Sequence, residues 1–166
     1  MKRFRTVATS LTQNRQHVTQ ANLEPRQLAL VITDLHAGGA ERCCAELAIR
    51  LNQSGYCCEV YSLFPPPPTD KQRLVDILRT SKVPVHFLNA TSVGSLPRVI
   101  RRLRQELRRQ QPHVVQSFLF HANFCTALAR RGLETVFVGG IRVAEPRKLH
   151  LRLARCVDRY VDHYVC

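Results

Sequence analysis

Residues 28–42 read Leu-Ala-Leu-Val-Ile-Thr-Asp-Leu-His-Ala-Gly-Gly-Ala-Glu-Arg, and the organisation of the whole chain follows from this stretch. Residues 28–33 form an apolar, partly β-branched run with the length and composition of a strand buried on both faces. Polar Asp34 follows, and after Gly38 and Gly39 the apolar residues recur at helical spacing. The stretch therefore predicts a buried strand, a glycine turn and a helix that ends near residues 52–55.

The glycine turn has two interpretations. Two adjacent glycines let the backbone come close to a ligand, and the first N–H groups of a helix favour an anion such as a diphosphate. A Gly-Gly pair between a strand and a helix is also often no more than a tight turn. Neither the three spaced glycines of the dinucleotide fingerprint nor the Gly-Lys-Ser/Thr of the P-loop is present. Spacing alone leaves both interpretations open.

Length and charge limit the class of protein. The chain has 166 residues, a formal net charge of +13 and a sequence pI near 10.2. Residues 1–26 are polar and basic without an apolar period, so we expect a disordered leader there and one domain over residues 27–166. The charge favours polyanions, phosphorylated ligands or an anionic membrane surface as partners, without choosing among them.

The cysteines and the apolar segments bear on compartment. The seven cysteines form no Cys-x-x-Cys pattern, so we expect reduced, mostly buried thiols and no metal site. The sequence has neither the apolar core of a secretory signal nor a run of about 20 apolar residues that could span a membrane. We therefore expect a cytoplasmic protein, and any contact with the inner face of the membrane would be peripheral.

Strand and helix patterns alternate along the rest of the chain. Further strands are expected at 56–64, 83–88, 113–118, 135–141 and 160–166, and further helices at 70–81, 95–111, 120–131 and 148–157. The four prolines at 65–68 cannot pair in a sheet and predict a stiff connector. This alternation predicts the α/β class, with a Rossmann-like parallel sheet that carries helices on both faces.

The helix expected at 95–111 carries much of the positive charge. Its apolar residues make one stripe, and arginines crowd the remaining faces, at Arg98, Arg101, Arg102, Arg104, Arg108 and Arg109. Such a face is either a solvated surface of a sheet-covering helix or a contact site for anionic lipid or another polyanion.

Ligands of parallel α/β sheets bind outside the carboxyl ends of the strands. Applied here, that rule gathers a candidate pocket rim, made of Asp34, His36, Gly38, Gly39, Phe118, His121 and Arg142. Less specific roles stay open for two of these residues. His121 is also an ordinary residue for a helix start, and Arg142 could simply neutralise a carboxylate such as Glu145.

Three segments together resemble a known family. They are similar in order and spacing to the amino-terminal domain of GT-B glycosyltransferases of family 4 (glycosyl transferase group 1). The segments are residues 34–42, which contain the Gly-Gly-Ala-Glu-Arg element, residues 113–123 and residues 158–166. The resemblance implies the amino-terminal half of a GT-B fold, which faces a second Rossmann-like domain that binds the nucleotide-sugar. The chain ends where that second domain would follow, so we expect a fragment that is inactive alone.

The resemblance also implies roles for the rim residues. Gly38 and Gly39 would offer backbone N–H groups to the donor phosphates. Many family members place a histidine near the transferred sugar, and in the simplest register that position is Phe118 here. The nearest histidine is His121, which would take this role. Arg142 would contact a phosphate or the acceptor. The implied reaction moves a sugar with retained configuration from a nucleotide-sugar, which is a substrate, to a glycan or lipid-linked acceptor of polysaccharide biosynthesis, with no metal or other cofactor.

Two other functions remain compatible with the sequence. The net charge would suit a basic Rossmann-like module that binds nucleic acid, although the glycine turn would then have no purpose. A non-catalytic protein that kept the fold without the donor half is the second alternative.

Overall fold

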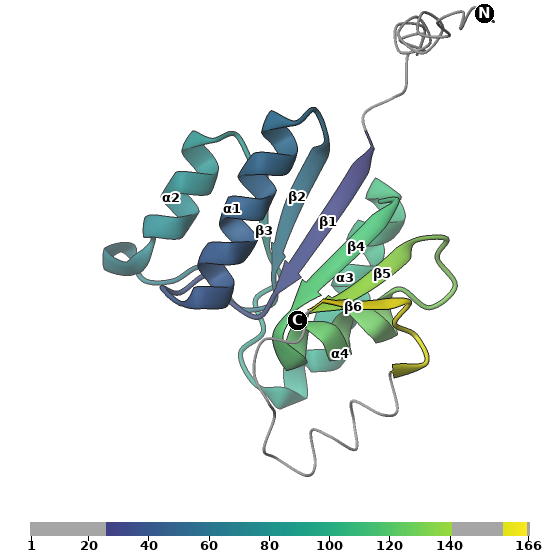
Figure 1. The fold of residues 1–166 in the computed structure, drawn as a ribbon. Coiled ribbons are helices and arrows are strands. Elements are labelled where there is room, and N and C mark those ends of the chain that lie inside the picture. Colours follow the sequence, from purple (N-terminus) through teal and green to yellow (C-terminus); the bar gives the residue numbers. More distant parts are fainter. Residues whose placement is uncertain (1–25, 141–157, 166) are drawn as a thin grey trace, which may run out of the picture.

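The computed structural model describes residues 26–140 and 158–165, and these form one parallel sheet with helices on both faces (Figure 1). The strands are β1 (Gln27–Ile32), β2 (Cys57–Ser62), β3 (Val85–Phe87), β4 (Val114–Phe118), β5 (Val136–Gly140) and β6 (His163–Val165). The helices are α1 (Gly39–Gln53), α2 (Arg73–Thr80), α3 (Leu96–Gln110) and α4 (Leu119–Ala129), with 3-10 turns η1 (Thr69–Lys71) and η2 (Val93–Ser95). The predicted fold class is confirmed.

The central strand β1 has the double burial that its sequence predicts. Ala29 and Val31 belong to the core under α3 and α4, while Leu30 and Ile32 belong to the core under α1 and α2. All four side chains are at most 2% exposed. A continuous apolar run is needed here because both sides of the strand are covered by helices.

Strand order places the loops of two central strands next to each other. The order across the sheet is β3-β2-β1-β4-β5-β6, and every pairing is parallel. The chain leaves β1 towards α1 on one face and leaves β4 towards α4 on the other, although the two strands are neighbours. The connections diverge at this pair, which is the switch point where sheets of this order bind their ligands.

Most of the predicted elements are present with shifted ends. Gly55 has a φ of 85°, as expected for the left-handed residue after α1. The helix predicted from residue 70 begins at Arg73, because Lys71 N–H bonds to the Pro68 carbonyl and makes a 3-10 turn first. The predicted leader at 1–26, apart from Arg26, lies outside the described residues, as do the helix predicted at 148–157 and Arg142.

Candidate functional site

The turn after β1 is built by its own side chains. The Asp34 carboxylate accepts a hydrogen bond from the backbone N–H of His36 at 3.0 Å, which closes a local turn. Between them Leu35 is fully buried and anchors the loop in the core under α1. His36 is exposed on the surface. Asp34 therefore shapes the turn, while His36 is free of the core.

The two glycines do not behave as residues of a strained turn. Gly38 is extended, with a φ of −149°, and Gly39 is the first residue of α1 rather than a left-handed one. A Cβ added to Gly39 would meet nothing within 4 Å, and one added to Gly38 would meet only the end of the flexible Glu41 side chain. Neither backbone conformation nor packing demands glycine at Gly39, so the tight-turn interpretation leaves it unexplained.

The first turn of α1 is open at its positive end. No side chain caps it, and Gly38 contributes only its carbonyl, which accepts from the Arg42 N–H at 3.1 Å. Glu41 is the acidic residue of the first turn, and its carboxylate lies back over Gly38. An anion at this place would meet unblocked N–H groups and the helix dipole, in competition with the Glu41 carboxylate.

The turn after β4 is different, because strand and helix join without a loop. Phe118 ends β4, Leu119 begins α4, and Leu119 adopts a φ of 70° to make the change of direction. A left-handed conformation is unfavourable for a bulky side chain, so the surroundings must hold it. The Leu119 side chain packs against the core under α1, which supplies part of that hold.

A side-chain clamp secures this second turn. Ser117 Oγ donates a hydrogen bond to Asn123 Oδ1 at 2.6 Å, and Asn123 Nδ2 donates to the Gly140 carbonyl at 3.1 Å. Asn123 thereby ties the end of β4 to the end of β5. Gly140 lies so close to β4 that an added Cβ would stand 2.7 Å from the Ser117 carbonyl oxygen. Sequence reasoning missed this clamp, whose signals were an asparagine in an apolar helix and a glycine pair ending a strand.

The structure separates the sequence candidates at β4. Phe118 is 1% exposed and packs in the core under α1, so its side chain faces away from solvent. His121 lies in the first turn of α4 and is exposed, with its ring edge-on to Phe120 at a centroid distance of 5.4 Å. Of these two positions only His121 can meet a ligand. His121 and the glycine turn both lie at the carboxyl ends of the strands, because β1 and β4 are parallel neighbours.

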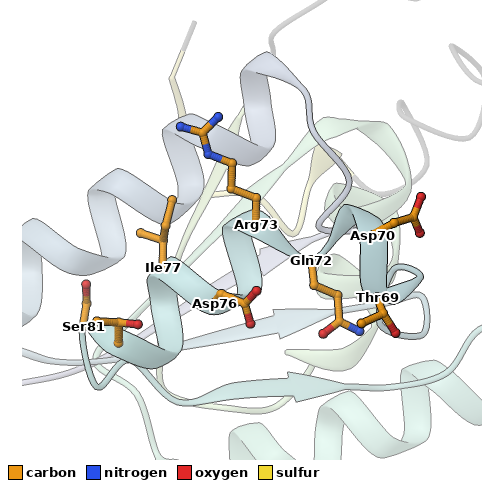
Figure 2. A pocket seen from close by; sticks show the side chains of 8 residues that line it. Thr69, Asp70, Gln72, Arg73, Asp76, Ile77 and Ser81 are labelled. Carbon is orange, nitrogen blue, oxygen red and sulfur yellow. The ribbon is translucent and has the colours of Figure 1, made fainter.

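A surface hollow of about 640 Å³ lies elsewhere, along α2 and η1 (Figure 2). It is lined by Thr69, Asp70, Gln72, Arg73, Asp76, Ile77, Thr80 and Ser81. Figure 2 shows Arg73 and Ile77 pointing to one side of α2, while Gln72 and Thr69 point to the other. Because the polar groups do not converge, this hollow is a poor candidate for a catalytic site.

Three of the thiols are buried rather than reactive, while Cys43 and Cys57 are half-buried. Cys44 of α1 and Cys58 of β2 are at most 1% exposed in the core under α1, and Cys125 is equally buried under α4. Burial raises the pKa of Cys58 and of Cys125 to about 12, and that of Cys44 still further. Within residues 26–140 and 158–165 no group of three metal-ligating side chains exists, and no helix there has the length and apolarity to cross a bilayer.

Comparison with protein families decides the assignment. The sequence profile of Glycosyltransferase Family 4 matches residues 37–164, which includes both glycines of the turn, His121 and Asn123. The chain belongs to Glycosyltransferase Family 4. No curated protein sequence matches this family member significantly.

Solved glycosyltransferases share the fold of this family 4 domain at low sequence identity. MurG of Acinetobacter baumannii has a TM-score of 0.63 and 11% identity, over 84% of this chain and 41% of that one. HepE of Anabaena in complex with UDP and glucose has a TM-score of 0.66 and 17% identity, over 84% and 37%. The lipopolysaccharide outer core galactosyltransferase WaaB has a TM-score of 0.60 and 13% identity, over 83% and 38%. The chain thus spans less than half the length of these proteins.

Proposed function

We propose that this family 4 chain is the acceptor-side, amino-terminal domain of a retaining glycosyltransferase. The enzyme would move a sugar from a nucleotide-sugar to a glycan or lipid-linked acceptor of polysaccharide biosynthesis. The observation that carries the proposal is the open space at Gly39, the first residue of α1, which starts at the switch point without a side-chain cap. The complexes of HepE with UDP and with UDP-glucose support a nucleotide-sugar as donor.

In the proposed reaction an acceptor hydroxyl attacks the anomeric carbon on the face that the diphosphate leaves, which retains the configuration. The bond from that carbon to the diphosphate oxygen breaks, and the hydroxyl proton passes to the departing diphosphate. Negative charge then grows on the leaving nucleoside diphosphate. The N–H groups of Gly39 and Ala40 would donate to this charge, and because it is largest in the transition state they would lower the barrier to transfer. His121 would bond to the transferred sugar, and Arg142 to a phosphate or the acceptor. No metal or cofactor takes part.

The proposal assigns one wall of the reaction cleft to this chain. The donor-binding wall would come from a second Rossmann-like domain. Half a cleft neither excludes water nor holds the whole donor, so the 166-residue chain should bind the diphosphate weakly and transfer no sugar alone.

A titration of the isotope-labelled chain with UDP tests the role of the glycine turn. We expect the amide signals of residues 38–41 to move most, and Gly39→Val to weaken UDP binding at least tenfold, because its side chain fills the space that the phosphate needs. Gly94→Val is the matched control, since a Cβ there would also meet no atom closer than 3.7 Å. Equal weakening by both variants, or shifts centred on another edge of the sheet, would reject the proposed function.

A further inference from the structure

The arginines of α3 fall into two groups. Three have partners in the chain: Arg102 donates to the Leu88 carbonyl, Arg104 donates to the Ala129 carbonyl, and Arg109 pairs with Glu106. The other three are exposed and make no ion pair or hydrogen bond with any residue of 26–140 or 158–165, namely Arg98, Arg101 and Arg108. We call this second group the arginine track.

The arginine track is a line along the outside of the helix. With 3.6 residues per turn its three residues point to one side, opposite the buried Val99, Leu103 and Leu107, and they span about 15 Å along the helix axis. The helix follows β3, so it begins near the carboxyl ends of the strands, where the glycine turn lies, and runs back towards their amino ends. One end of the track therefore lies on the same side of the domain as the candidate site.

The charge pattern at the start of α3 opposes the stability of the helix. The first turn contains no acidic residue, and Arg98 stands there, where the helix dipole disfavours a cation. Arg98 and Arg101 are also neighbours at i,i+3, a spacing at which like charges repel by a few tenths of a kcal/mol. Arg108 stands in the last turn, where the dipole favours a cation, but Arg98 and Arg101 lower the stability of the helix. None of the three is neutralised by a described residue, so all three are available to an external anion.

The burial of α3 decides between kinds of anion. The apolar side of the helix is at most 1% exposed at Val99, Leu103 and Leu107, so it is not available for insertion into a bilayer. The exposed large hydrophobic side chains of the described residues lie on other elements, such as Ile77 of α2 and Val136 of β5. α3 also has no aromatic residue on which a nucleic acid base could stack.

We infer that the arginine track binds a linear anionic glycan, with carboxylate or phosphate groups repeated along the polymer. This inference rests on the proposed function, since it makes the track a binding surface for an anionic acceptor. Guanidinium groups pair with carboxylates and phosphates through two parallel hydrogen bonds, and a row of them selects a polymer over a single charge. The reacting end of the glycan would reach the candidate site at the carboxyl ends of β1 and β4, while the rest of the polymer lies along α3.

Binding of a fluorescent oligogalacturonate, which has one carboxylate per sugar, tests the inference on the 166-residue chain. We expect binding that weakens with salt, and no binding of a neutral maltooligosaccharide of equal length. The triple variant Arg98→Gln, Arg101→Gln, Arg108→Gln should bind at least tenfold more weakly. It should also lower the slope of log K against log salt by about 2, if counterions are released as from single-stranded nucleic acid.

A second triple variant is the control for net charge. Lys71→Gln, Arg73→Gln and Lys82→Gln remove the same charge from exposed positions outside α3, and we expect them to change binding less than twofold. Equal loss in both triple variants would overturn the inference, as would tighter track-dependent binding to anionic vesicles or to single-stranded DNA of equal charge. The UDP titration does not involve the track, so failure of this inference and failure of the proposed function give different experimental results.

Discussion

The turns after β1 and β4 lie next to each other, yet they are built in opposite ways. The turn after β1 exposes His36 and contains a glycine that the fold does not require, although its helix lacks a side-chain cap just as α4 does. The turn after β4 has no loop, holds Leu119 in a left-handed conformation and is tied by Asn123 to the next strand. The comparison teaches that one turn is kept accessible while the other is held in place.

This contrast makes a general prediction about substitutions. Changes in the turn after β4 should lower the free energy of unfolding, because they remove contacts that hold an unfavourable backbone. Changes in the turn after β1 should alter ligand binding with little effect on unfolding. The four variants below are ordered by their expected effect on stability.

Gly140→Ala should have the largest effect. Its Cβ would stand 2.7 Å from the Ser117 carbonyl oxygen, and backbone cannot move aside as a side chain can, so we expect a loss of about 3 kcal/mol. Urea unfolding measures it. Gly139→Ala is the matched control, because its Cβ would meet side chains rather than backbone, namely Val161 and the ring of Tyr164, which is 44% exposed on edge strand β6. Equal losses at both glycines would contradict the close approach of β4 and β5.

Asn123→Ala should come second. It removes two hydrogen bonds and leaves the Gly140 carbonyl without its side-chain donor, which should lower stability by about 1 to 3 kcal/mol. A double-mutant cycle with Ser117→Ala separates the two bonds. If the two single losses simply add, Ser117 and Asn123 are not coupled, and the clamp as described here is wrong.

Gly39→Ala should act in the opposite direction on stability. The residue is helical and its Cβ would meet nothing, so alanine should stabilise the chain by about 0.4 to 1 kcal/mol through the unfolded state. Binding of UDP should nevertheless weaken, less than in Gly39→Val. Thermal unfolding and the UDP titration give the two measurements. Tighter UDP binding would contradict a close approach of the phosphate to Gly39.

Glu41→Gln should have the smallest effect on unfolding. Loss of an acidic residue from the first turn of α1 should lower stability by about 0.3 to 1 kcal/mol. The same change removes a carboxylate that lies over Gly38, so affinity for UDP should rise several-fold. Glu46→Gln, whose carboxylate pairs with Arg50 further along α1, is the control and should leave UDP affinity unchanged.

The sequence predicted the open turn better than the held one. The spacing of apolar residues shows which side of an element meets the core. That spacing predicted the alternation of strands and helices, the end of α1 and the side of α3 on which the arginines lie. The period says nothing about single backbone angles, so the left-handed Leu119 and the burial of Phe118 at the expected histidine position were not foreseen. The bond from Asn123 to Gly140 joins residues 17 positions apart, so predicting it needed the register of β4 and β5.

The two buried thiols beneath α1 give the molecule a built-in probe. Cys44 belongs to α1 and Cys58 to the strand below it, and neither is reachable while the helix rests on the sheet. Their rate of alkylation in native buffer therefore reports how often α1 lifts away. A nucleotide bound at the start of this helix should slow the alkylation of both thiols. The alkylation rate would then report nucleotide binding without any sugar transfer.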